Sequence, residues 1–436
     1  MRSDGPSEWP SGAAALRLSL LLLLALGMVS RVLAGQWPAI RSIEFAGNGI
    51  TRPQTMLREI TVRVGDPADP ARIERSRQAI QDLGLFRSVA AELQPLPGGV
   101  RLLFTVKEKW PLLPVPRVEG NGSGEYGYGA QLRWNNLWGL NHTLNLQAMR
   151  RRFRDPDKTA NTQLQLGYNA PFLGGSPYGL SGSLGLSNQD SLDAQGRPYH
   201  EVFESAALGG SYALSAQHPS AGWSLGAGLD WQRDSPSGAF APRSASYALG
   251  PAFSATYNDL RYLIYSEQGQ RLRVSTQYSL DGLAANYSSA SGSVAWRRDW
   301  QVGATPHQTL ELLGSGGLYL GGAPGRTHDF YTLGGQRTLR GYPSTFVEGD
   351  TGYYLAGAYL RPVGPSWLRL LATVEAGNAF ADLHHLHGPA AYSSIALGLR
   401  VRVNWLVNLE LEAGAALPLD RARGVRLFAG SVDQGR

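Results

Sequence analysis

Apolar and polar residues alternate along most of the chain after residue 109. Between residues 393 and 404, for example, Ile395, Leu397 and Leu399 share one face, whereas Arg400 and Arg402 share the other. A period of two residues is typical of β-strands with one apolar face. Similar segments recur up to the C-terminus, separated by Gly, Pro, Asn, Asp and Ser, and no helical period persists there. The pattern predicts an all-β region over residues 109–436.

We expect about sixteen antiparallel strands in this region. Most are long enough to cross ~25 Å of hydrocarbon at a tilt, which takes about 9–11 residues, and tryptophans cluster near their ends as interfacial girdles require. A soluble sandwich is the alternative, but its strands are normally shorter. The sequence therefore predicts a transmembrane β-barrel with an apolar outer face and a polar lumen. The expected strands begin near residue 112 and continue at 126–136, 142–153, 161–173, 178–190, 199–214, 223–235, 245–260, 265–280, 286–300, 307–320, 352–364, 367–380, 391–404, 405–420 and 424–432.

Residues 35–108 show a different pattern, with one strand, two helical segments and two further strands. Thr51 and Gln54 have the spacing of a capping box at the first helix, and Asp69 followed by Pro70 marks the start of the second. The order β-α-α-β-β predicts a small α+β domain before the barrel. A purely structural role for this domain remains open.

An apolar run of about a dozen residues, Leu18 to Val29, lies near the N-terminus and is followed by Val32-Leu33-Ala34. It is too short to span a bilayer, and small residues after it resemble a cleavage site. We expect residues 1–34 to be a secretory signal peptide; an uncleaved anchor is the alternative.

Composition and charge exclude several classes of function. The chain has 54 Gly and no Cys, so disulfides and Cys-ligated metals are excluded, and a net charge of +6 over 436 residues is no nucleic-acid footprint. The match of Gly222–Gly226 to a hydrolase nucleophile elbow lies in a predicted strand, where no helix can follow it. His384, His385 and His387 are better explained as solvated loop residues than as metal ligands. We expect no catalytic residues, no cofactor and no metal.

One long Gly-rich loop, residues 321–351, interrupts the strand pattern. Its centre reads Leu339-Arg340-Gly341-Tyr342, which combines a fixed cation, a residue that permits φ > 0 and an aromatic wedge. So long a loop is usually functional or disordered. We expect its tip to plug a cavity.

The first and last strands of the barrel must pair to close it. Pro114 and Pro116 lie in the first strand and cannot donate to a ladder, and the last strand is short and contains Gly424 and Gly430. The sequence predicts a weak seam that opens sideways. The alternative is that the prolines belong to an entry linker and that ordinary pairing begins after them.

The order of the first domain, with its early Gly-Asn-Gly and the segment Leu83 to Val89, resembles a POTRA domain. The whole arrangement is similar to the BamA/TamA superfamily of outer-membrane assembly and translocation barrels. Leu339–Tyr342 resembles that family's Val-Arg-Gly-Phe/Tyr signature between strands eleven and twelve, and Asn136–Gly139 resembles its Asn-Leu-x-Gly segment.

The resemblance implies that the loop folds back into the barrel and that its arginine meets an acid on strand thirteen. The family's Phe-x-Asp-x-Gly motif reads Thr373-Val374-Glu375-Ala376-Gly377 here, so Glu375 is the expected partner of Arg340, beside Gly377. In a water-filled lumen such a pair contributes only about 0–1 kcal/mol, so we expect it to set loop position more than stability.

The resemblance also implies a function in the outer membrane of a Gram-negative bacterium, with the POTRA-like domain in the periplasm. The expected activity is insertion, assembly or translocation of polypeptides, with clients bound by strand addition; the alternative is a dedicated secretion transporter or pore for a single partner. The implied partners are unfolded outer-membrane or secreted polypeptides, outer-membrane lipid and lipopolysaccharide, and possible periplasmic accessory proteins, without nucleic acid. The run Arg150–Arg154 faces either lipopolysaccharide phosphates or plain solvent.

Overall fold

The computed structural model describes residues 37–120, 126–152, 161–193, 195–215, 218–241, 244–322, 330–386, 391–420 and 424–432. The predicted signal peptide, Arg154 and His387 lie outside the described residues. None of the helices in the described part of the chain is long and apolar enough to cross a lipid bilayer.

The first domain contains a three-stranded sheet with the order β1-β3-β2, in which β1 runs parallel to β3. The elements follow in the predicted order β-α-α-β-β. They are β1 (Ile40–Ala46), α2 (Pro53–Leu57), α3 (Pro70–Asp82), β2 (Phe86–Leu96) and β3 (Gly99–Glu108). Apolar side chains of both helices pack on this sheet, and Val407 of the barrel joins the same core.

The two helix starts behave differently from each other. Asp69 caps α3 as predicted, because its side chain accepts a hydrogen bond of 2.9 Å from the amide of Ala71. The predicted capping box at Thr51 is wrong: Arg52 is the N-cap of α2, and no side chain caps that helix. The amide of Thr51 instead donates to Glu108 at 2.6 Å, since this segment is held by neighbouring elements rather than by its own helix.

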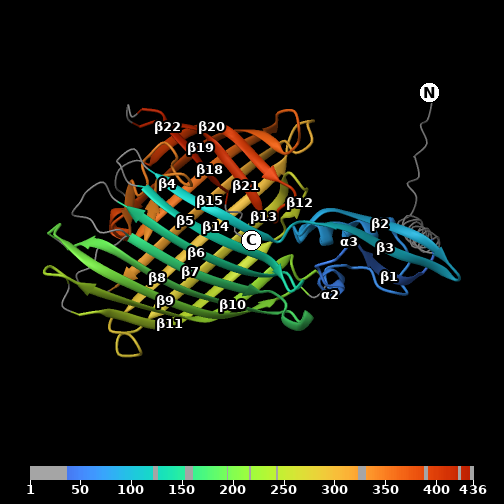
Figure 1. Ribbon diagram of the computed structural model, residues 1–436, viewed down its shortest axis with the longest axis horizontal. Coiled ribbons are helices and arrows are strands. Elements are labelled where there is room, and N and C mark those ends of the chain that lie inside the picture. Colours follow the sequence, from blue (N-terminus) through green and yellow to red (C-terminus); the bar gives the residue numbers. More distant parts are fainter. Residues whose placement is uncertain are drawn as a thin grey trace, which may run out of the picture.

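The barrel is closed and antiparallel, as Figure 1 shows. Within the described residues its order contains seventeen strands, of which β12 has two residues and β11 also pairs directly with β13, leaving sixteen long strands. The predicted sixteen-stranded barrel is therefore confirmed. The strands are β4 (Leu112–Gly120), β5 (Tyr126–Leu137), β6 (His142–Arg152), β7 (Asn161–Ala170), β8 (Tyr178–Leu192), β9 (Pro198–Ala213), β10 (Gly222–Ser237), β11 (Ser246–Asn258), β12 (Arg261–Tyr262), β13 (Glu267–Ser279), β14 (Ser289–Gln301), β15 (Thr309–Gly321), β18 (Thr351–Pro362), β19 (Leu368–Phe380), β20 (Tyr392–Val403), β21 (Leu409–Pro418) and β22 (Arg426–Ser431).

The alternation predicted from the sequence separates the two faces of the barrel wall. On β19 and β20, Val374 and Leu397 are 59% and 62% exposed and point outward, whereas Glu375 and Ser394 are fully buried and point inward. The segment Gly222–Gly226, which matches a hydrolase nucleophile elbow, lies within strand β10, so Ser224 is a strand residue there. The outer face is thus apolar and the inner face polar.

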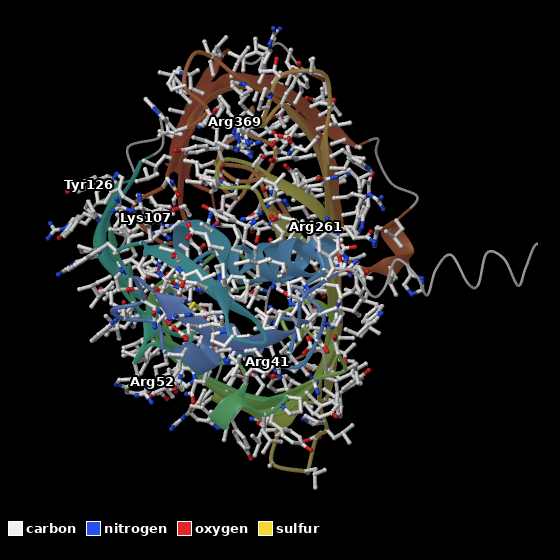
Figure 2. All side chains as sticks on the ribbon, turned by 90° about the vertical axis from the view of Figure 1, so that its right-hand side faces the viewer. Arg41, Arg52, Lys107, Tyr126, Arg261 and Arg369 are labelled. Carbon is white, nitrogen blue, oxygen red and sulfur yellow. The ribbon has the colours of Figure 1, made fainter. Side chains whose placement is uncertain are left out.

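The first domain lies across one end of the barrel (Figures 1 and 2). The turn between β5 and β6 meets the start of α2. Asn136 donates from its side chain to the hydroxyl of Thr51 at 2.8 Å, and the carbonyl of Gly139 accepts from the amide of Arg52 at 3.0 Å and from the hydroxyl of Thr55 at 2.8 Å. The Asn136–Gly139 segment therefore holds the domain on the barrel.

A buried carboxylate makes the second attachment. Glu59 accepts a 2.7 Å hydrogen bond from the hydroxyl of Ser220, and its other oxygen lies 2.9 Å from Nδ1 of His218, both in the turn between β9 and β10. Arg58 lies beside it at 3.0 Å and covers the ring of Phe172. Burial would raise the pKa of Glu59, but the hydrogen bonds from His218 and Ser220 and the charge of Arg58 outweigh it, so the pKa lies below its usual value.

Helix α3 makes the third attachment, to the short strand β12. The amide of Tyr262 donates to Asp82 at 2.7 Å, and its carbonyl accepts from Gln78 at 3.1 Å. Lys109 donates to the Tyr262 hydroxyl at 2.6 Å and to the carbonyl of Gly84 at 3.0 Å. Three separate turns of the barrel thus fix the domain at this end.

Gly139→Ala should loosen the first attachment. Gly139 has φ of +71°, and a Cβ there would lie 2.1 Å from the carbonyl oxygen of Ile50. Displacing the turn removes the two hydrogen bonds to its carbonyl, a loss of about 1–3 kcal/mol at about 0.5–1.5 kcal/mol each. Hydrogen exchange at the amide of Arg52 should then speed up by about tenfold or more.

Gly174→Ala is the matched control. Gly174 has φ of +60° in another turn at the same end, but a Cβ there would meet nothing within 4 Å. It carries the same backbone strain without the clash. Equal exchange at Arg52 in both variants would show that the Gly139 contact does not hold the domain.

Candidate functional site: the Arg340 loop and the barrel seam

The loop between β15 and β18 lies against the inner face of the barrel. It begins and ends with the antiparallel strands β16 (Tyr331–Leu333) and β17 (Val347–Gly349). The hydroxyl of Tyr331 lies 2.7 Å from that of Ser315, an inward residue of β15. The predicted loop, residues 321–351, thus contains a short hairpin; its residues 323–329 lie outside the described part of the chain.

An aromatic cluster anchors the tip of the loop. Tyr342 is 1% exposed, stacks on Phe346 at 4.5 Å between ring centroids and meets Tyr392 of β20 edge-on. Its hydroxyl donates to the carbonyl of Ser393 at 3.1 Å. Leu339 is fully buried in the same cluster, so the tip fills space inside the barrel.

Gly341 has a different role from the one predicted. Its φ is not positive; Leu339 adopts the left-handed conformation instead, with φ of +45°. A Cβ on Gly341 would lie 2.7 Å from the nitrogen of Pro418 and 2.9 Å from Cβ of Ser394. Gly341 therefore permits close approach of the loop to β20 and β21.

The structure brings Arg340 and Glu375 together. The guanidinium donates to one carboxylate oxygen at 2.5 Å, and the backbone amide of Arg340 donates to the other at 2.7 Å. The same guanidinium donates to Glu412 of β21 at 3.0 Å and lies over the ring of Phe428 of β22. One arginine thus joins the loop to β19, β21 and β22.

The environment of this pair is not the water-filled lumen that we expected. The Glu375 side chain is fully buried and that of Arg340 is 12% exposed. Tyr354 and Ser394 each donate a further 2.8 Å hydrogen bond to Glu375. Gly377 makes room for the loop, because a Cβ there would lie 2.9 Å from the Leu333 side chain. Removing one partner of such a buried pair strongly lowers the stability of the fold, because it leaves an uncompensated buried charge.

An ion-pair network that was not predicted from the sequence continues from Glu412 along the inner wall. Its members are inward-facing and mostly buried charges of β13, β14, β15, β19, β20 and β21. The network joins Arg400 to Glu311 and Glu412, Arg369 and Arg402 to Glu410, and Arg297 to Glu267 and Asp299. The sequence feature that could have predicted these pairs is the alternation of charged and apolar residues in β20 and β21. In antiparallel register it places Arg400 opposite Glu412 and Arg402 opposite Glu410.

At the seam, β22 is the neighbour of β4 in the barrel order. Pro114 and Pro116 lie in β4, where they face Leu132 and Ala130 of β5. A proline has no N–H, so the unbroken ladder with β5 must use the amides of the odd-numbered residues of β4. The nitrogens of both prolines therefore face β22, and this edge lacks two donors.

The other side of the seam is short. Strand β22 has six residues, and Gly424 precedes it. Gly430 faces Glu412 of β21, and a Cβ there would lie 2.9 Å from the side chain of Gln336 in the loop. Arg117 of β4 donates to the hydroxyl of Ser431 at 3.4 Å across the seam. Predicted seam residues thus lie at or beside the junction, and the loop touches β22 from inside.

A small α+β domain fixed to one end of a closed barrel, with a loop folded onto the inner wall, defines the class of POTRA-bearing outer-membrane β-barrels. Residues 38–109 match the POTRA family, described as surface antigen variable number repeat. A segment of 107 residues is 34% identical to the outer membrane protein assembly factor BamA of Nitratidesulfovibrio vulgaris. That segment covers 23% of this chain and 13% of the relative, so the chain matches a small part of that protein.

Solved structures extend the likeness to the barrel. BamA from Haemophilus ducreyi lacking POTRA domains 1–3 aligns with a TM-score of 0.52 at 16% identity, covering 89% of this chain and 82% of that one. CdiB from Acinetobacter baumannii aligns with a TM-score of 0.58 at 16% identity, covering 90% and 73%. The predicted similarity to the BamA/TamA superfamily, the outer-membrane location and the periplasmic POTRA domain are confirmed.

Arg340→Ala should destabilise the loop and the barrel wall together. The substitution leaves Glu375 and Glu412 without their shared cation, and removing one partner of a buried pair costs about 3–5 kcal/mol. We expect a clear fall in the temperature at which the folded barrel is lost on semi-native gels. The control is Arg361→Ala, an exposed arginine of β18, whose loss should change stability by less than about 0.5 kcal/mol. Equal melting of the two variants would refute a structural role for Arg340.

Proposed function

We propose that this protein inserts or translocates polypeptides at the outer membrane. The observation that carries the proposal is the seam, where a strand lacking two donors meets a strand of six residues. Few backbone hydrogen bonds have to break to part such strands, and an exposed strand edge is a template for another chain. The relative named as an outer membrane protein assembly factor supports the same activity.

The POTRA domain supplies a place for clients to bind first. Strand β2 lies at the edge of its sheet and pairs with β3 in the described residues. An extended peptide adds to such an edge through main-chain hydrogen bonds, which hold many sequences with little selectivity. Leu93, which is 42% exposed on β2, offers an apolar contact for the added strand. Unfolded polypeptides are therefore the clients that this domain fits.

Because the three attachments hold the domain at the barrel end, a client on β2 is kept close to the barrel. Tethering raises the effective concentration of the client at the seam without any new contact. The Arg340 loop meanwhile fills the inner side of β19 to β22, so that the wall beside the seam keeps its shape while the seam parts.

Depletion in the native bacterium tests this function against a dedicated transporter. If the protein is a general assembly factor, many outer-membrane proteins should fall together in the membrane proteome. Loss of one secreted product with an otherwise unchanged outer membrane would instead establish the alternative, a transporter for a single partner.

Locking the seam tests the mechanism. The chain has no Cys, so Arg117→Cys with Ser431→Cys places a unique thiol pair across the junction, which a flexible reducible bis-maleimide can bridge. Crosslinking should abolish client insertion, and reduction of the crosslinker should restore it. The matched control is Ser275→Cys with Ser293→Cys, treated with the same reagent, whose hydroxyls lie 2.7 Å apart across β13 and β14. Full activity of the crosslinked seam variant would show that opening is not required.

A further inference from the structure

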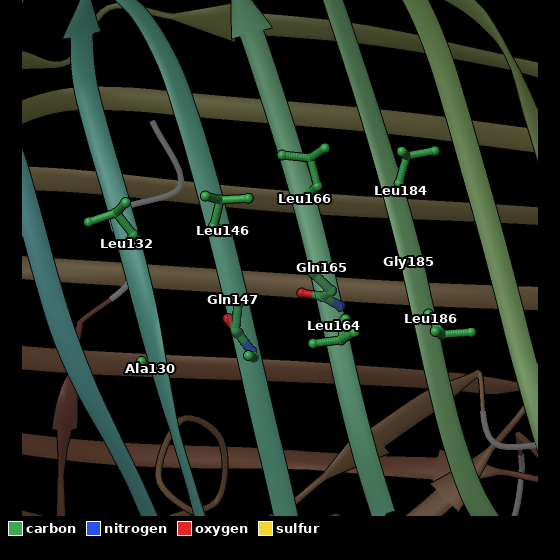
Figure 3. A pocket seen from close by; sticks show the side chains of 11 residues that line it. Ala130, Leu132, Leu146, Gln147, Leu164, Gln165, Leu166, Leu184, Gly185 and Leu186 are labelled. Atoms are coloured by element: carbon green, nitrogen blue, oxygen red, sulfur yellow. The ribbon is translucent and has the colours of Figure 1, made fainter.

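A hollow lies on the outer, membrane-facing side of β5 to β8. It has a volume of about 470 Å³ and an almost wholly apolar lining (Figure 3). Two rows of paired residues cross these four strands. The first row consists of Leu132, Leu146, Leu166 and Leu184, and the second of Ala130, Ala148, Leu164 and Leu186. Because the second row changes from leucine to alanine on β5 and β6, the hollow lies over the two alanines.

Cations lie directly beyond the hollow on the same face. Arg150 and Arg152 follow Ala148 along β6 at every second residue, so they point outward as Ala148 does. Both are exposed, and they face Tyr128 and Tyr126 of β5 in register. Since two residues advance a strand by about 6.6 Å, Arg150 lies within reach of a headgroup whose chain enters the hollow.

The POTRA attachment fixes which leaflet this site faces. Trp138, in the turn at the other end of β5, accepts a hydrogen bond from Arg52 of the POTRA domain. That end is periplasmic, so the end of β6 that carries Arg150 is the outer one. The hollow and its cations therefore belong to the outer leaflet.

Neighbouring acids have partners of their own. On the same outward face, Asp190 forms an ion pair with His200 at 3.2 Å, and Glu204 faces Arg233 of β10 in register. The residues that face Arg150 across its two strand pairs are Tyr128 and Thr162, which are neutral. The positive charge beside the hollow is thus not cancelled by its cross-strand neighbours.

We propose that this hollow binds a phosphorylated, multiply acylated glycolipid of the outer leaflet, of the lipid A type. One acyl chain lies over Ala130 and Ala148 between the leucines. Arg150 and Arg152 pair with a sugar phosphate, for which the guanidinium fork is well matched. Tyr126 and Tyr128 lie at headgroup level, as interfacial aromatics do. The site adjoins the seam, because Pro114 and Pro116 of β4 continue the same two rows.

Native mass spectrometry of the full chain in detergent can measure this binding. The two probes are diphosphoryl lipid A and the same acylated sugar without phosphates. The wild-type chain should bind the phosphorylated lipid about tenfold more tightly, because charge-assisted hydrogen bonds to phosphate are lost with the other probe. Equal affinity for both probes would mean annular lipid only and would overturn the proposal.

Two variants separate the headgroup from the chain. Arg150→Gln with Arg152→Gln should remove the preference for phosphate while leaving the chain contact. Ala148→Leu fills the hollow and should lower the binding affinity for both probes by a similar factor. The matched controls are Arg233→Gln, at another outward arginine, and Ala372→Leu, at an outward position of β19. No difference between variants and controls would refute the site.

A photo-crosslinking residue at position 130 distinguishes lipid from polypeptide. During client assembly in vesicles that contain lipid A, the proposal requires crosslinks to the lipid. Crosslinks to the client that added lipid A does not displace would show that the groove receives a polypeptide strand, and would overturn the lipid assignment.

Discussion

A charge buried inside the barrel needs an opposite charge close by, and this constraint decides where the loop lies. Glu375 and Glu412 project inward from β19 and β21, and both side chains are buried away from solvent. Arg340 binds both carboxylates, which a planar guanidinium with five donors can do and a single ammonium point charge does less well. If the loop left the wall, Glu375 would lose its cation and Glu412 would keep only Arg400, so the loop is held in place by the electrostatic cost of separating it from these acids.

The features predicted correctly from the sequence are those with a local signal. Alternation with a period of two defines the barrel wall, and Asp69 with Pro70 marks the start of α3, because each depends on residues close together in the chain. The partner of Arg340 on β19 came from resemblance to a family. Glu412, the second partner, is 72 residues away from Arg340, and no local pattern specifies which inward acid the closed barrel brings to the loop.

Two of the three wrong predictions, those for Thr51 and Gly341, have one physical origin. Thr51 has the spacing of a capping box, yet Glu108 and Asn136 use its amide and hydroxyl. Gly341 suggests a left-handed turn, yet what the site requires is the absence of a Cβ beside Pro418. A sequence shows which conformations and bonds a residue permits, but packing against distant elements selects among them. Both errors fall where the loop or the POTRA domain meets the barrel, so the contacts that local reasoning misses are those on which the proposed function depends.

The two sides of the seam are held unequally. Strand β22 is supported from inside, because Arg340 covers Phe428 and Gln336 lies beside Gly430. Strand β4 has no donor at Pro114 or Pro116 on the seam side. If the seam opens as we propose, the loop keeps β22 in place against β21. A strand that lacks two donors is a poor template, because an incoming chain cannot complete its ladder there. On the proposed mechanism the edge of β22 is therefore the better template for a client, although β22 is the shorter of the two strands.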